Sequence, residues 1–136
     1  NMALYDPWAH ARELGFLVLN EQPGCGLAAL YLGDGVIMLS PKLSWRQARC
    51  TLAHEIIHAE RDDEPMPHMH DLDVRRERYC DVVSAQRLIF HRDLVKAASH
   101  YPGNPFAIAY ELGVTHNVLN TYLQEYHAAA GKPIMV

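Results

Sequence analysis

The segment from Thr51 to His58, Thr-Leu-Ala-His-Glu-Ile-Ile-His, constrains the fold of this chain more than any other stretch of its sequence. Its two histidines are four positions apart, so on an α-helix they project from one face, about one turn apart. Apolar residues also recur at helical spacing upstream, among polar ones: Leu43, Ala48, Leu52 and Ala53 among Arg46, Gln47 and Arg49. Ser44 is a suitable N-cap, and a charged run at 60–64 follows. The sequence therefore predicts a helix of about four turns that carries both histidines.

The pattern His54-Glu55-x-x-His58 is typical of zinc-dependent hydrolysis. In such sites two imidazoles bind the metal, and the adjacent carboxylate acts as a general base towards water. Our hypothesis is that Glu55 takes a proton from the attacking water and passes it to the leaving amine during peptide hydrolysis. The alternative interpretation is an amphipathic core helix with two coincidental histidines.

Glu77 and Asp81 are the candidates for completing the site, since a catalytic zinc usually has three protein ligands. They are four positions apart in the next predicted helix, so they share a face. We expect Glu77 to be the third ligand and Asp81 to accept a ring N–H from His54 or His58, which would fix the imidazole orientation. Glu77 also fits a solvated charged face at 75–78. Two histidines and a carboxylate favour Zn²⁺ but do not exclude Mn²⁺ or Fe²⁺.

Two runs of the sequence, at 49–58 and 77–88, resemble the ImmA/IrrE family of gluzincin-type metallopeptidases. The first is Arg-Cys-Thr-Leu-Ala-His-Glu-Ile-Ile-His, and the second reads Glu-x-x-Cys-Asp-x-x-Ser-Ala-x-x-Leu. Cys80 and Ser84 stand where that family usually has alanine. The resemblance implies the same roles for the candidate residues: His54, His58 and Glu77 as metal ligands and Glu55 as the base.

The resemblance also implies a function. Members of the family occur in phages, integrative elements and stress-response systems, where they cut helix-turn-helix repressors. We therefore expect a zinc endopeptidase that cleaves a helix-turn-helix transcriptional repressor, such as a phage or mobile-element immunity repressor, in the bacterial cytosol. The alternative is a non-catalytic, metal-binding antirepressor or toxin–antitoxin partner that acts by protein–protein binding. The presence of Glu55 favours the enzyme, because a binder has no need of a general base.

The predicted fold class is α+β, with a small antiparallel three-stranded sheet, a helical zincin-like core and C-terminal helices. The expected elements are a helix at 3–14; strands at 16–19, 27–32 and 36–40; and helices from Ser44 to before Glu60, over 72–90 and 93–99, from Asn104 towards Gly113, and from Thr115 to about Ala129. A chain of 136 residues is expected to be one compact metallopeptidase domain, with parts at 2–40, 43–90 and 93–129.

Further residues are candidates by type alone. The oxyanion donor, or another cleft residue, could be any one of His68, His70, Tyr79 and His91.

An extended substrate could add as a further strand to a sheet edge at 36–40, although that strand could equally lie in the core. Cys50 lies one turn before His54, but three successive turns of a straight helix do not converge on one ion. A buried apolar cysteine explains it better.

Charge limits the expected partners. The net charge is −4 and the isoelectric point is near 6.1, so there is no broad basic surface for nucleic acid. Residues 109–119 match the apolar and glycine skeleton of a helix-turn-helix, but no lysine or arginine lies between Ala97 and Gly131. We interpret this segment as packing or as a docking surface for the repressor, without direct nucleic-acid binding. No apolar run approaches the ~20 residues of a membrane span, so we expect no membrane association and a cytoplasmic protein.

Overall fold

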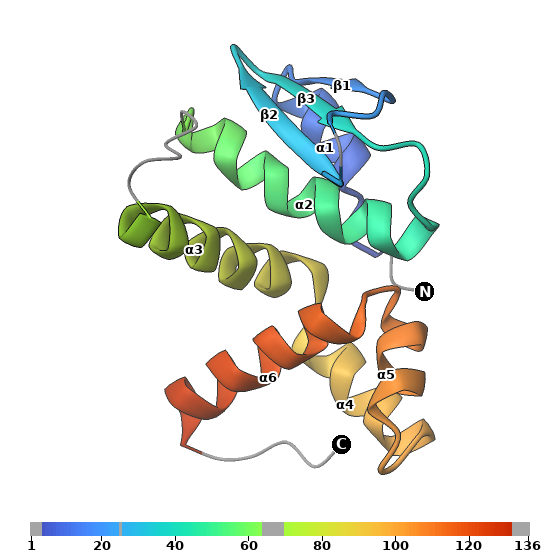
Figure 1. Ribbon diagram of the computed structural model, residues 1–136. Coiled ribbons are helices and arrows are strands. Elements are labelled where there is room, and N and C mark those ends of the chain that lie inside the picture. The colour runs from blue at the N-terminus through green and yellow to red at the C-terminus, as the bar shows by residue number, and fades with distance from the viewer. Residues whose placement is uncertain (1–3, 25, 64–69, 132–136) are drawn as a thin grey trace.

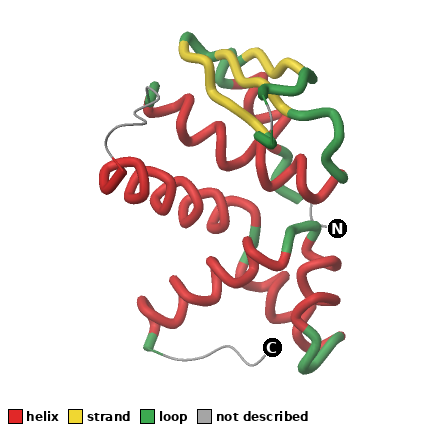
Figure 2. Tube along the Cα trace, in the orientation of Figure 1, coloured by secondary structure: helices red, strands yellow, loops and turns green. Residues whose placement is uncertain are grey.

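The structure is a computed structural model that describes residues 4–24, 26–63 and 70–131. Within these residues the chain forms six helices and three strands (Figure 1). They are α1 (Pro7–Glu13), β1 (Leu17–Leu19), β2 (Ala29–Gly33), β3 (Val36–Leu39), α2 (Trp45–Arg61), α3 (His70–Leu88), α4 (His91–His100), α5 (Pro105–Leu112) and α6 (His116–Ala130). The predicted α+β class is confirmed, and the strands gather at one end of the molecule (Figure 2). None of the described helices combines the length and apolar character needed to cross a membrane.

The sheet is mixed, which corrects the prediction of a wholly antiparallel sheet. In the strand order β1-β3-β2, β2 and β3 form an antiparallel hairpin, whereas β1 pairs with β3 in parallel, with Leu17 opposite Val36. The turn at 34–35 forces β2 against β3, but the longer connection at 20–28 leaves β1 free to pair with the other side of β3. Because β3 is paired on both sides, the prediction of a substrate-binding edge at 36–40 is wrong. Within the described part of the chain, the free edges of this sheet belong to β1 and β2.

Helix α2 carries the motif and lies between the sheet and α3 (Figure 1). It begins at Ser44, which forms a capping box with Gln47, and ends at Asp62, whose φ of 53° is left-handed. One face packs against the sheet and α1 in a buried cluster of Ala11, Tyr31, Ile37, Leu39, Leu52, Ile56 and Ala59. Another face contributes Cys50 and Ala53 to a second cluster, which it shares with the C-terminal helices. The motif helix is therefore held by two separate apolar clusters.

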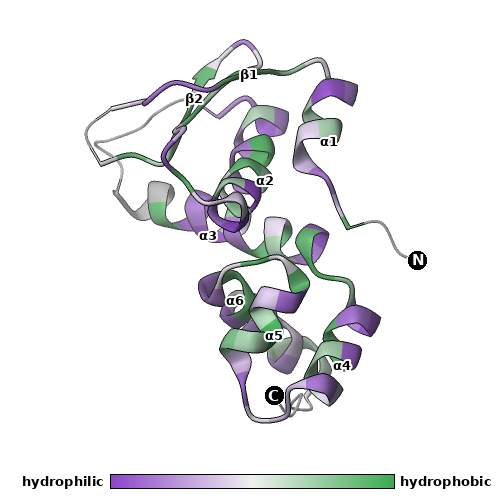
Figure 3. Ribbon diagram, turned by 90° about the vertical axis from the view of Figure 1, so that its right-hand side faces the viewer, coloured by the Kyte–Doolittle hydropathy of each residue, from purple (hydrophilic) through white to green (hydrophobic). Residues whose placement is uncertain are grey.

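Helices α4, α5 and α6 lie on the side of α2 and α3 away from the strands (Figure 3). Asn104 caps α5, Gly113 ends it with a φ of 70°, and Thr115 caps α6, so the segment has the predicted helix-turn-helix-like order. A Cβ atom on Gly113 would lie 3.2 Å from the ring of Trp45, so the turn packs closely on the start of α2. The apolar skeleton of this segment is buried against the other helices (Ile108, Ala109, Leu112, Val114, Leu119 and Leu123). Packing therefore accounts for its sequence pattern.

Candidate metal centre

His54 and His58 face a single carboxylate across the contact between α2 and α3. Nε2 of His54 lies 2.8 Å from Oε2 of Glu77, and Nε2 of His58 lies 2.7 Å from Oε1 of the same side chain. The two ring centroids are 5.0 Å apart. The one-turn spacing of the motif and the packing of α3 thus bring three potential ligands to one point. Two imidazole nitrogens and a carboxylate are a donor set that suits a zinc ion.

The outer nitrogen of each ring is held by a second carboxylate. Nδ1 of His54 lies 2.8 Å from Oδ1 of Asp81, and Nδ1 of His58 lies 3.0 Å from Oδ2 of Asp63. These contacts orient both rings and leave each Nε2 directed towards Glu77, as in sites where carboxylates support metal-bound histidines. Asp81 thus lies beside a motif histidine, as its spacing from Glu77 led us to expect.

Asp63 is a further residue of the site, and the sequence pattern gave no sign of its role. It lies just beyond the end of α2, inside the charged run that the pattern marks only as a helix end. The left-handed Asp62 turns the chain back on the helix, and the backbone N–H of Asp63 donates to the carbonyl of His58. Helical periodicity gives no signal for such a residue, because its position depends on the turn.

Hydrogen bonds to the surrounding groups make both imidazoles strong bases. Burial lowers the pKa of His54, but Asp81 and Glu77 outweigh it and raise that pKa to about 10. Burial likewise lowers the pKa of His58, while Cys80, Glu77 and Asp63 raise it to about 11. The same two histidines hold the pKa of Glu77 far below its ordinary value. Protons therefore occupy this cluster when no metal is bound, and a divalent cation would displace them.

Glu55 is placed beside this cluster and next to the sheet. Burial raises the pKa of its carboxyl, and the nearby histidines lower it in part. The backbone N–H of Tyr31 in β2 donates a hydrogen bond to the Glu55 carboxylate. Its side chain thus lies between the histidine pair and the edge strand of the sheet. A carboxylate with a raised pKa in this position can act as a general base.

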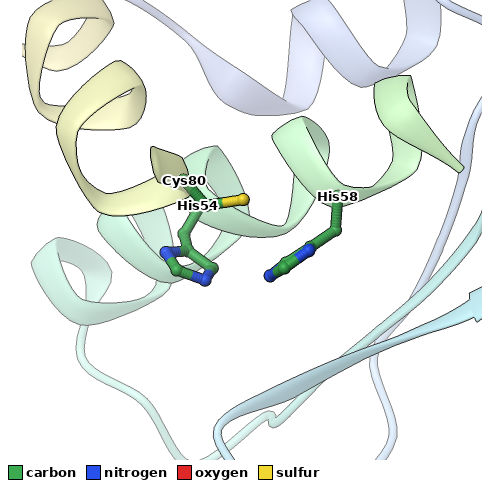
Figure 4. Close-up of side chains that lie close together, drawn as sticks. All are labelled: His54, His58 and Cys80. Carbon is green, nitrogen blue, oxygen red and sulfur yellow. The ribbon is translucent and has the colours of Figure 1, made fainter. Parts of the chain in front are cut away.

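Cys80 is a further potential donor, one turn after Glu77 on α3. Its side chain is fully buried, and its sulfur and one ring nitrogen from each histidine all lie within 4.8 Å of one another (Figure 4). Glu77 and Cys80 are therefore both near enough to complete a metal site. Glu77 is the stronger candidate for the third position, because its oxygens contact both rings at 2.8 Å or less. Cys80 was not among the site residues expected from the sequence.

Two of the four candidates for an oxyanion donor or cleft residue, Tyr79 and His91, contact residues outside the histidine pair. The half-exposed ring of Tyr79 lies 4.5 Å from the Arg61 guanidinium, a cation–π contact. His91 begins α4 and stacks on Tyr126 of α6, so it belongs to the C-terminal helices. His68 and the side chain of His70 lie outside the described residues. The structure thus brings neither Tyr79 nor His91 into the histidine cluster.

A cavity of about 500 Å³ opens beside His54. Asp81 lines it next to that histidine. The other walls come from α2 and the connection before it, from the segment before β2 and from the start of α6 (Ala28, Leu43, Gln47, Cys50, Thr51, Thr115, His116, Asn117 and Val118). Cys50 is buried in this wall, and burial raises the pKa of its thiol. The start of α6 was not predicted to border the site, since His116 lies 35 residues beyond Asp81 along the chain and in a different helix.

Comparisons with protein-family models, with curated proteins and with solved structures find no match to this chain. Its function is therefore inferred from the geometry of the cluster and from the motif residues.

Proposed function

We propose that this chain is a zinc peptidase whose metal is held by His54, His58 and Glu77. The observation that carries the proposal is the convergence of both Nε2 atoms on one carboxylate, at 2.8 and 2.7 Å. The donor set fits zinc, and each ring is oriented by a further carboxylate on its Nδ1. A bound zinc ion would supply the Lewis acid that polarises a peptide carbonyl and activates water.

Glu55 performs the proton transfers of the reaction. Its carboxylate accepts the proton of the attacking water and transfers it to the amine that leaves. The raised pKa of Glu55 suits both steps, because the group must take up a proton and then release it near neutral pH. Asp63 and Asp81 keep the imidazole rings in place throughout.

The free edge of β2 is the proposed site for an extended substrate. The N–H of Tyr31 points to Glu55, so this side of β2 faces the candidate base. Extended peptides commonly bind by adding a strand to such an edge. We further propose, from the resemblance to the ImmA/IrrE family, that the substrate is a helix-turn-helix repressor and that cleavage takes place in the bacterial cytosol.

The test compares the wild type with Glu55→Gln, each co-expressed with a helix-turn-helix repressor encoded beside its gene. We expect repressor fragments, identified by mass spectrometry, with the wild type alone. Native mass spectrometry should show about one zinc per chain in both proteins, because Glu55 is not a ligand. A Glu55→Gln protein that cleaves at the wild-type rate would refute the mechanism. Relief of repression by both proteins without cleavage would favour the non-catalytic antirepressor.

A second comparison tests the metal centre itself. Glu77→Ala should bind zinc at least about 10-fold more weakly, because it removes the carboxylate that contacts both histidines. Glu125→Ala is the matched control, since it removes a carboxylate that pairs with Arg78 of α3 without touching either histidine. Equal zinc content in all three proteins would overturn the assignment of Glu77.

A further inference from the structure

Cys80 has a buried thiol directed at the histidine pair. Its side chain has no exposed surface, and it comes from α3, the helix that also supplies Glu77. In Figure 4 the sulfur points into the space between the His54 and His58 rings. The three potential donor atoms form a triangle whose sides are all 4.8 Å or less. The nearby Cys80 side chain also helps to raise the pKa of the His58 ring.

These separations are close to those of a metal site. With zinc–nitrogen and zinc–sulfur bonds of about 2.1 and 2.3 Å, nitrogen and sulfur ligands of a tetrahedral ion lie about 3.6 Å apart. Closing the remaining gap requires the donor atoms to approach one another by at most about 1.2 Å, which rotation of the side chains can supply. The backbones of α2 and α3 need not move.

We propose that Cys80 is a ligand of the metal held by His54, His58 and Glu77, so that the resting centre has four protein ligands. This inference rests on the proposed metal centre. On binding, the thiol proton leaves to solvent as the sulfur–metal bond forms. Four protein ligands would fill the tetrahedral positions, so water would bind either as a fifth ligand or after one protein ligand is released. Glu77 is the candidate for a reversible release, because half of its side chain is exposed whereas Cys80 is enclosed.

A thiolate ligand also determines which metals the centre prefers. Soft sulfur ligands select zinc and cobalt over manganese, which prefers oxygen. We therefore expect the wild type to prefer zinc to manganese, and Cys80→Ala to reduce that preference by about 10-fold or more.

Cobalt(II) titration of the metal-stripped full chain is the direct test, because absorption bands report the ligands without any enzyme assay. The wild type should show visible d–d bands together with a near-ultraviolet thiolate-to-cobalt charge-transfer band. Cys80→Ala should keep the d–d bands and lose the charge-transfer band. Cys50→Ala is the matched control, a second buried cysteine near His54 that should keep both.

The outcomes separate this inference from the proposed function. Visible cobalt bands without a charge-transfer band in the wild type, or a charge-transfer band that persists in Cys80→Ala, would overturn ligation by Cys80 and leave the metal centre intact. A complete absence of cobalt bands in the wild type would overturn the metal centre as well. If Cys80→Ala does not fold, as judged by circular dichroism, Cys80→Ser provides the same test with a side chain of nearly equal size.

Discussion

Oδ2 of Asp63 lies 3.0 Å from Nδ1 of His58, although Asp63 follows the end of the helix that carries the histidine. The left-handed conformation of Asp62 produces this contact by folding the chain back on the last turn of α2. It gives His58 the same kind of support that Asp81 gives His54 from α3. Both rings are therefore oriented by carboxylates on different elements, and the affinity of the metal should depend on each of these contacts.

Asp63→Asn should weaken zinc binding about 10- to 100-fold, because the amide supports the His58 ring less well than a carboxylate does. Competition with a chromophoric chelator measures this affinity. Asp62→Asn is the control: it removes a neighbouring carboxylate that accepts from the Tyr31 hydroxyl, and asparagine tolerates the left-handed conformation. A similar loss of zinc affinity in both variants would show that the affinity depends on the local charge and not on the contact with His58.

The stability of the metal-free protein should fall as the pH rises above neutrality. The pKa values of His54 and His58, about 10 and 11, lie above the ordinary value of 6.5, so the folded state binds these protons more tightly than the unfolded state. This stabilisation is complete below pH 6.5 and is lost as the pH rises through the two raised values. In the presence of a chelator, we expect the melting temperature to drop by at least about 4 °C between pH 6.5 and 9.5.

Glu77→Gln is the comparison for that experiment. Without the carboxylate that contacts both rings, the pKa values of the histidines should return towards 6.5, and the melting temperature should depend less on pH over this range. The same pH dependence in both proteins would assign the effect to other titrating groups.

Arg49→Met should destabilise the protein by about 3 kcal/mol, because several buried carbonyl groups lose their donor. The Arg49 side chain is 1% exposed and donates to the carbonyls of Tyr5, Leu112 and Gly113, which ties the N-terminal segment to the end of α5. Urea denaturation measures the change. Arg46→Met, which removes one bond to the Val114 carbonyl, should cost only about 1 kcal/mol. An equal loss of unfolding free energy in the two variants would contradict the prediction that Arg49 contributes more to stability than Arg46.

The helix-turn-helix-like segment should not confer DNA binding. Its buried apolar residues, such as Leu112, Val114 and Leu119, belong to the helical core, and residues 97–131 contain no lysine or arginine to contact phosphates. Fluorescence anisotropy with labelled duplex DNA at low salt should show no saturable binding by the full chain. Saturable binding that weakens with added salt would contradict this expectation.

The sequence by itself predicted the features that depend on residues a few positions apart. The N-caps at Ser44, Asn104 and Thr115, the helix that carries the motif and the common face of Glu77 and Asp81 all follow from local hydrogen bonds and the helical repeat. Side chains one helical turn apart share a face in any α-helix, whatever surrounds it. That is why the spacing of the two motif histidines is enough to predict that their rings lie side by side.

Only the tertiary structure decided the features that join distant segments. The parallel pairing of β1 with β3 depends on where the connection at 20–28 leads the chain, and alternation of apolar residues carries no information on this. The position of Asp63 depends on a left-handed turn, and that of the Cys80 thiol on how α3 packs against α2. These contacts form between elements whose relative placement is set by burial of the whole core, which no local pattern encodes.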